Sequence, residues 1–150
     1  MDTSPAHRPA GDGPSTIVTG VDGSPTSLRA AAYAAGLARR QGARLVAVHV
    51  AHPPVTAHLA PLVEAELRGT LREITEEVRG EIQQGAGHVG MNIDFVAVDG
   101  DPYGQLVRVA DELEADAIVV GASAHTGHRI VGSLAVRLVR AGRWPVTVVP

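Results

Sequence analysis

The sequence predicts an α/β protein: a doubly wound, five-stranded parallel sheet with helices on both faces, a Rossmann-like arrangement. Two observations support this prediction. Short apolar strand patterns alternate along the chain with helical patterns of about ten residues or more, as β-α-β units require. The second strand pattern, residues 44–50, is apolar at nearly every position, which is typical of a parallel strand buried on both faces. In such sheets, ligands bind at the carboxyl ends of the strands, where the strand order reverses.

The first strand is expected over residues 16–21, which are rich in β-branched side chains. An Asp-Gly-Ser-Pro turn follows it. Ser24 or Thr26 can cap the next helix, and the proline of the turn suits that helix's first turn. The alanine-rich pattern of residues 26–41 predicts this helix, and Gly42 predicts its end.

The rest of the chain continues the same alternation of strands and helices. The expected helices carry apolar residues at helical spacing, so that each has one face to bury. The expected elements are a strand at 44–50, a helix at 59–84, a strand at 93–98, a helix at 102–113, a strand at 117–120, a helix at 133–141 and a strand at 146–149.

The composition is that of a globular protein and excludes several classes of function. Hydrophobic residues make up 45% of the 150 residues, charged residues 19%, and the formal net charge is −3. This balance gives no reason to expect binding to nucleic acid or to an anionic membrane. No cysteine is present, so disulfides, thiolate metal sites and thiol nucleophiles are excluded.

The chain ends and apolar runs suggest one domain without targeting or membrane segments. Residues 1–15 are rich in Pro, Gly and Ser and are expected to be a disordered tail, followed by a domain over residues 16–150. No apolar run reaches the roughly 18 residues that a membrane span needs. The N-terminus also lacks the basic start and apolar core of a signal peptide.

The stretch from Ala117 to Trp144 indicates function most strongly. It runs from an apolar strand through a glycine-bearing loop into a helix that begins near Gly132 and Ser133. The first turn of a helix has unpaired N–H groups and a dipole that favours an anion, and glycine lets the backbone approach a ligand. The order of the parts therefore suits a phosphate site, although the glycine spacing is not that of a Walker loop.

Residues at the ends of the other strands join this loop in one candidate site. Asp22 could accept hydrogen bonds from an amine or hydroxyl group of a ligand, or it could form an Asx turn that caps the next helix. Gly100 could lie close under a ligand, or the Gly-Asp-Pro sequence at 100–102 could simply initiate a helix. Both alternatives remain open at each position.

From Thr16 to Val149 the chain resembles the universal stress protein family. The resemblance rests on the order and spacing of short pieces rather than on one motif. These pieces are Val21-Asp22-Gly23-Ser24, Val48-His49-Val50, Gly100-Asp101-Pro102, Ala115 to Gly121, Gly132-Ser133 and Pro145 to Pro150. The resemblance implies a cytoplasmic stress-response role, a regulatory partner protein and a homodimer. The family's last strand commonly pairs across the dimer axis, which here implies an interface at Val146, Thr147, Val148 and Val149.

The family divides into members that bind ATP and members that do not. The binders carry Gly, two residues, Gly, nine residues, and then Gly followed by Ser or Thr. Here Ala124 stands in place of the second glycine, and only seven residues separate it from Gly132. The shortened loop contains His125, His128 and Arg129, whose charge could replace the missing backbone donors.

Carried onto this chain, the family's binding residues define a candidate site for ATP, with or without Mg²⁺. The resemblance implies that Asp22 and Val50 hold the adenine end. It also implies that the backbone of Gly121 and Gly132, with the Ser133 hydroxyl, holds ribose and phosphates. The candidate ligand-binding residues are Val21, Asp22, Gly23, Ser24, Val50, Gly100, Val120, Gly121, Ala122, His128, Arg129, Gly132, Ser133 and Leu134.

Neither a metal site nor a catalytic centre is expected. His49 and His52 are three residues apart on a strand or loop, a spacing that does not bring two imidazoles together. Ser133, at a helix start, is an N-cap or phosphate ligand, because nothing marks a general base for it. Any ATP hydrolysis would be slow and incidental.

Two hypotheses follow for the function. The first is a stress-response or regulatory protein that binds an adenine nucleotide, ATP, at the carboxyl ends of the strands. The alternative is a dimeric interaction module of the same family that binds no nucleotide because its phosphate loop is degenerate.

Overall fold

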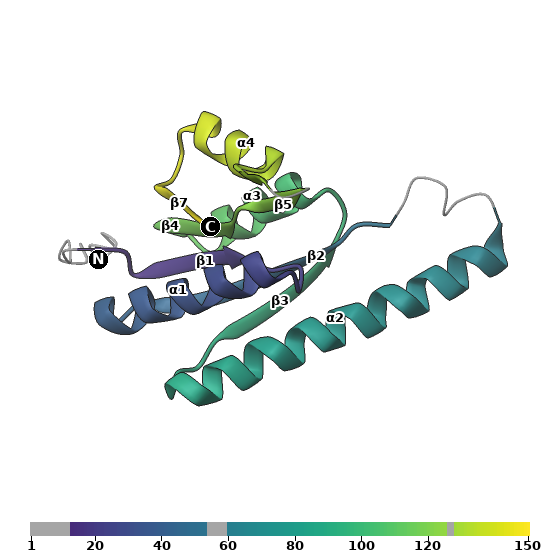
Figure 1. Ribbon diagram of the computed structural model, residues 1–150, viewed down its shortest axis with the longest axis horizontal. Helices are drawn as coiled ribbons and strands as arrows, with labels where there is room; N and C mark the ends of the chain where they lie inside the picture. The colour runs from purple at the N-terminus through teal and green to yellow at the C-terminus, as the bar shows by residue number, and fades with distance from the viewer. Residues whose placement is uncertain (1–12, 54–59, 126–127) are drawn as a thin grey trace, which may run out of the picture.

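Five parallel strands in the order β3-β2-β1-β4-β7 form the central sheet of the computed structural model (Figure 1). The structure describes residues 13–53, 60–125 and 128–150. The strands of the sheet are β1 (Thr16–Gly20), β2 (Arg44–Ala51), β3 (Asp94–Asp99), β4 (Ala117–Gly121) and β7 (Val146–Val149). The helices are α1 (Pro25–Gln41), α2 (Pro61–Val89), α3 (Pro102–Glu112) and α4 (Ser133–Ala141).

The strand order reverses between β1 and β4. From β1 the chain adds β2 and then β3 on one side, and it later returns to add β4 and β7 on the other. Ile17 in β1 therefore lies opposite Leu45 of β2 on one side and Ala117 of β4 on the other. The reversal opens a crevice at the carboxyl ends of these strands. The predicted fold class, a doubly wound parallel sheet, is confirmed.

Helices cover both faces of this sheet, α1 and α2 on one side and α3 and α4 on the other (Figure 1). On the α3 and α4 side, Leu106 and Leu138 pack against Val18 and Ile118. On the opposite side α1 buries a row of alanines, whose small side chains let the helix approach the sheet closely. These alanines are Ala30, Ala31, Ala34, Ala35 and Ala38.

The predicted ends of the first helix are correct. Ser24 caps α1, because its Oγ accepts a hydrogen bond from the N–H of Ser27 at 3.2 Å. Gly42 ends the helix in the left-handed conformation, with φ of 62°. The later helix α2 was predicted to stop at residue 84 but runs to Val89, since Gly90 provides the left-handed C-cap there. Its predicted start at residue 59 lies outside the described residues.

The sequence did not predict the short antiparallel hairpin formed by β5 (Ser123–His125) and β6 (His128–Ile130). These strands are only three residues long and are polar, so they lack the apolar alternation that identifies a strand. The hairpin occupies the middle of the stretch that was expected to be a glycine loop. Its paired strands use backbone groups for each other that an open loop would leave available to a ligand.

The predicted tail, residues 1–15, falls mostly outside the described residues. Ser15, at its end, is tied to the domain: its N–H and hydroxyl both donate to the Asp116 carboxylate, at 2.8 and 2.7 Å. The Thr16 N–H donates to the same oxygen at 2.9 Å. In the described part of the chain, no helix is long and apolar enough to cross a membrane.

Thr19, in the middle of β1, is expected to destabilise the fold through its hydroxyl. Its side chain is fully buried, and Oγ1 has no hydrogen-bond partner among the described residues. The substitution Thr19→Val keeps the shape and removes the unsatisfied group, and should raise the free energy of unfolding by about 1 kcal/mol. Chemical denaturation would measure this. Thr26→Val is the control, since the Thr26 hydroxyl has a partner in Ser24 at 3.2 Å; an equal gain in both variants would contradict the explanation.

Candidate functional site

A cavity of about 420 Å³ lies at the carboxyl ends of β1, β2 and β4, where the strand order reverses. The first turns of three helices, α1, α3 and α4, contribute to its lining. The lining residues are Gly20, Val21, Asp22, Ser24, Thr26, Ser27, Val48, Val50, Pro102, Leu106, Val120, Gly121, Ala122, Ser123, Gly132, Ser133, Leu134 and Ala135.

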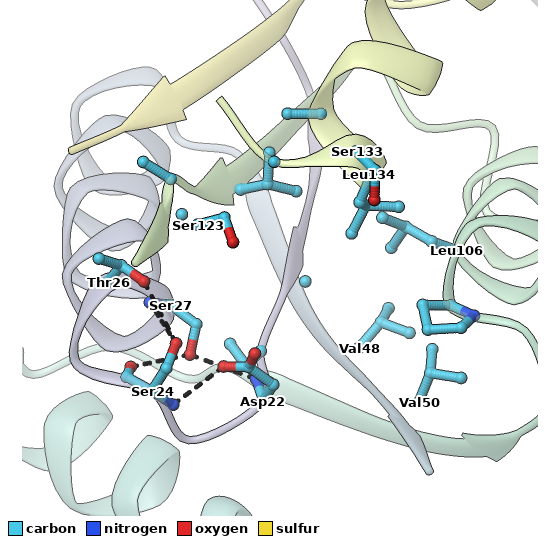
Figure 2. A pocket seen from close by; sticks show the side chains of 18 residues that line it. Asp22, Ser24, Thr26, Ser27, Val48, Val50, Leu106, Ser123, Ser133 and Leu134 are labelled. Atoms are coloured by element: carbon cyan, nitrogen blue, oxygen red, sulfur yellow. Dashed lines mark hydrogen bonds between the residues drawn. The ribbon is translucent and has the colours of Figure 1, made fainter. Parts of the chain in front are cut away.

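The two sides of the cavity differ in chemistry (Figure 2). Val48, Val50 and Leu106 lie along one side and offer an apolar surface. The opposite side carries polar groups from the β1–α1 turn and the start of α1, and Ser123 lies near them. Ser133, the first residue of α4, lies with Leu134 on the side of Leu106. The polar residues on the side of α1 are Asp22, Ser24, Thr26 and Ser27. An apolar wall facing convergent polar groups is the usual composition of a small-molecule site.

Asp22 forms the Asx turn that was one of its two predicted roles. Its Oδ1 accepts a hydrogen bond from the N–H of Ser24 at 2.9 Å, and its own N–H donates to the Ser27 hydroxyl at 3.2 Å. Partial burial raises the pKa of the Asp22 carboxyl, but hydrogen bonds from Ser24 and Ser27 outweigh this, and its pKa lies below the ordinary value of 3.8. The carboxylate is therefore ionised at neutral pH, and as a lining residue it remains able to accept a ligand hydrogen bond.

The lowered pKa of Asp22 predicts a pH dependence of stability. A carboxyl group with a lower pKa in the folded state stabilises the fold above the pKa of the unfolded chain, and this contribution disappears as the pH falls through the folded-state pKa. Asp22→Asn should therefore lower the free energy of unfolding at pH 7, by less than about 1 kcal/mol because the exposed side chain is screened by water. Denaturation at pH 7 and pH 3 should show the difference shrinking at acid pH. A difference independent of pH would contradict this origin.

The N-terminus of α4 differs from those of α1 and α3. Side-chain oxygens of Ser24 and Asp101 accept hydrogen bonds from the first turns of α1 and α3. The N-cap of α4 is Gly132, which has no side chain to do this. The first three residues of α4, Ser133 to Ala135, line the cavity. Unpaired N–H groups at a helix start, with the positive end of the helix dipole, favour an anion.

Gly121 and Gly132 have packing reasons to be glycine. A Cβ on Gly121 would lie 2.6 to 2.8 Å from backbone atoms of Thr26 and Ser27 in the first turn of α1. A Cβ on Gly132 would lie 2.9 Å from the Cβ of Ser123. Neither residue has a positive φ. Both glycines thus permit close approach between segments of the protein, in addition to any contact with a ligand.

Ten of the fourteen predicted ligand-binding residues lie together in the lining. Gly23 and Gly100 do not line the cavity. They have positive φ values of 82° and 135°, so their role is in the turns. Asp101 caps α3, so the 100–102 turn initiates a helix, which was one of its two predicted roles. The side chains of His128 and Arg129 lie outside the described part of the structure. The ten residues are Val21, Asp22, Ser24, Val50, Val120, Gly121, Ala122, Gly132, Ser133 and Leu134.

Sequence reasoning missed several lining residues. Val48 could have been found, because side chains two apart on a strand share a face and Val50 was already a candidate. Ser123 could not, because its position depends on the hairpin. Thr26 and Ser27 were considered only as part of a helix start. The other missed residues are Gly20, Pro102, Leu106 and Ala135.

His49, in β2, and His52, just after it, each form a hydrogen bond with a backbone carbonyl group. Nδ1 of His49, which is buried, is 2.9 Å from the carbonyl oxygen of Val21, and Nδ1 of His52 is 2.9 Å from that of Gly100. Each histidine thus supports a turn beside the cavity. Over the described residues, no group of three or more His, Cys, Asp or Glu side chains is arranged to hold a metal ion.

A doubly wound sheet with a cavity at its switch point, apolar on one side and polar on the other, is the architecture of a Rossmann-like domain. The particular family is shown by comparison with known proteins. The model of the universal stress protein family matches residues 14–150, and the chain belongs to this family. The universal stress protein MJ0531 of Methanocaldococcus jannaschii is 30% identical over 142 residues, covering 89% of this chain and 80% of the relative.

Solved structures of the family are similar in fold. UspA from Lactobacillus plantarum has a TM-score of 0.79 at 24% identity, covering 91% of this chain and 97% of its own. A universal stress protein in complex with cAMP has a TM-score of 0.64 at 27% identity, with coverage of 91% and 97%. The universal stress protein from Archaeoglobus fulgidus in complex with dAMP has a TM-score of 0.55 at 25% identity, with coverage of 90% and 97%.

Proposed function

We propose that this protein binds an adenine nucleotide, ATP, in the cavity at the carboxyl ends of β1, β2 and β4, and acts as a regulatory stress-response protein in the cytoplasm. The observation that carries the proposal is the cavity lined by the first turn of α4, whose N-cap has no side chain. An uncapped helix start beside a cavity suits a phosphate group. Two structurally similar family members are complexes with cAMP and dAMP, which are adenine nucleotides.

The two sides of the cavity suit the two parts of such a ligand. A flat, apolar base fits against Val48, Val50 and Leu106, where its burial is favourable. The Asp22 carboxylate and neighbouring hydroxyls can accept hydrogen bonds from ribose or from the amino group of the base. Mg²⁺, where it takes part, would be held by the ligand's phosphates and water, as is usual for this ion.

Titration calorimetry with ATP, ADP and adenosine, with and without Mg²⁺, tests the proposal. We expect a measurable heat of binding and a rise in the unfolding temperature at millimolar ATP, because a ligand that binds only the folded state stabilises it. GTP is the matched control for the base. Absence of both signals at millimolar ATP and ADP would contradict the proposal.

We infer further that the protein is not an enzyme. The Asp22 carboxylate is hydrogen bonded within its own turn, and the sequence marks no general base for the Ser133 hydroxyl. ATP occupancy would instead alter the surface presented to a regulatory partner protein. We also infer a homodimer through β7, the edge strand of the sheet, whose outer side needs cover.

A second candidate function is an interaction module that binds no nucleotide. The packing of Gly121 and Gly132 favours it, because this packing accounts for both glycines without a ligand. The β5–β6 hairpin, which replaces an open glycine loop, favours it as well. The same titration separates the two candidates, since the interaction module gives no nucleotide signal yet is expected to dimerise.

A further inference from the structure

Among the described residues that line the cavity, the net charge does not suit a phosphate ligand. Among its described residues one is charged, and that residue is an anion, Asp22. The first turn of α4 offers partial positive charge, but the helix dipole amounts to only about half an elementary charge. A bound nucleotide with several negative charges therefore calls for a cation near the mouth of the cavity.

Arg137 is placed to provide this cation. It follows Ser133 by four residues and so lies on the same face of α4, with its side chain directed towards the N-terminus of the helix. Its guanidinium reaches across to the start of α3, where it lies 4.0 Å from the Asp101 carboxylate and 4.0 Å from the centre of the Tyr103 ring. Asp101 directly precedes Pro102, a lining residue. The guanidinium of Arg137, in the second turn of α4, thus lies beside the start of α3, whose first residue lines the cavity.

We propose that Arg137 binds the phosphate groups of the nucleotide and so makes the site select phosphorylated ligands over the nucleoside. This inference rests on the proposed nucleotide-binding function and identifies a residue that binds the phosphate groups. The planar guanidinium can form two parallel hydrogen bonds to phosphate oxygens, which a lysine cannot do in the same geometry.

The contacts of Arg137 in the ligand-free protein allow it to change partner. Its distance to Asp101 is at the limit for an ion pair, and both side chains are more than half exposed. Such surface pairs contribute little to stability. Asp101 also has a second role that does not need Arg137, since its Oδ2 accepts the N–H of Gly104 at 2.7 Å. Stacking on Tyr103 holds the guanidinium beside the start of α3 and leaves its N–H groups able to donate to another partner.

Arg143 is a matched control on the same side of the molecule. It too combines an aspartate and an aromatic ring: its guanidinium lies 2.5 Å from Asp111 and 4.6 Å from the centre of the Trp144 ring. Asp111 lies at the end of α3, and Arg143 and Trp144 follow the end of α4, so this group is at the opposite ends of the two helices from the first turns that line the cavity. Removing its charge changes the net charge of the protein as much as removing that of Arg137, but away from the site.

The experiment compares Arg137→Gln, Arg137→Lys and Arg143→Gln by calorimetry with adenosine and with ATP. We expect Arg137→Gln to bind ATP about tenfold more weakly while adenosine affinity stays within about twofold, as loss of one charge-assisted contact would give. Arg137→Lys should recover part of the ATP affinity, and Arg143→Gln should leave both affinities unchanged. Unfolding temperatures of all variants, measured without ligand, verify that they are folded.

Four results would overturn the inference. Equal weakening of adenosine and ATP in Arg137→Gln would mean that Arg137 only supports the cavity wall. Equal weakening of ATP in both glutamine variants would mean that net charge is responsible. Unchanged ATP affinity in Arg137→Gln would exclude the contact while leaving the proposed function intact, whereas a wild-type protein that binds neither ligand would refute both.

Discussion

Replacing Gly121 by alanine is expected to destabilise the protein strongly and to abolish nucleotide binding. The added Cβ would lie 2.6 Å from the carbonyl carbon of Thr26, 2.7 Å from its oxygen and 2.8 Å from the N atom of Ser27. These are backbone atoms, so no change of rotamer relieves the overlap. Either the end of β4 or the first turn of α1 must move. We expect a loss of about 3 kcal/mol in the free energy of unfolding, at the upper end for overpacked sites.

The same substitution should affect binding because Thr26 and Ser27 line the cavity. A displaced first turn of α1 changes the polar side of the cavity along with its packing. Thermal unfolding should show the unfolding temperature of Gly121→Ala falling by about 6 to 12 °C, given the usual scaling for a domain of this size. Titration with ATP should give no heat of binding.

Gly80 in α2 provides the control. It is exposed in the middle of the helix, and a Cβ there would meet nothing within 4 Å. Gly80→Ala should therefore stabilise the protein by about 0.5 to 1 kcal/mol, since alanine is the better helix former. If Gly121→Ala instead kept its stability and lost only nucleotide affinity, the glycine would serve the ligand and the packing explanation would be wrong.

Gly121 also illustrates what could be predicted from the sequence. The alternation of strands and helices places this residue at a strand end, and the structure confirms the predicted doubly wound parallel sheet. The sequence therefore indicated correctly where the cavity lies. The reason for the glycine could not be read from the sequence, because the contact joins residues nearly a hundred positions apart.

The β4–α4 connection is a part of the site whose structure the sequence did not predict. Its glycines suggested an open phosphate loop, and the two missing residues were recognised as a departure from the family pattern. The hairpin formed by β5 and β6 was not predicted. Pairs such as Ser123 and Ile130 depend on a tight turn rather than on the apolar alternation that identifies a strand in a sequence. The position of the Arg137 guanidinium beside the start of α3 could likewise not be predicted, because sequence spacing along α4 does not reveal the reach of a long side chain.

The edge strand β7 leads to the last prediction: Val148→Pro should convert the proposed dimer to a monomer. The N–H of Ile118 in β4 donates to the Pro145 carbonyl, and the N–H of Ala122, just after β4, donates to the Val149 carbonyl. Since hydrogen-bonding groups alternate in direction along a strand, the N–H of Val148 points to the free edge. Proline at this position keeps the hydrogen bonds to β4 and removes a donor that a second copy would need.

Light scattering after size exclusion would measure the mass of each variant. The control is Val148→Thr, which has nearly the same shape and keeps the outward N–H. Val148 also packs against the core cluster on the α3 and α4 side. A charged residue there would disturb the monomer as well as the interface, so the control keeps the size of the side chain. We expect Val148→Thr to remain dimeric and Val148→Pro to run as a folded monomer. A dimeric Val148→Pro protein would place the interface elsewhere, and the edge of β7 would then need a different cover.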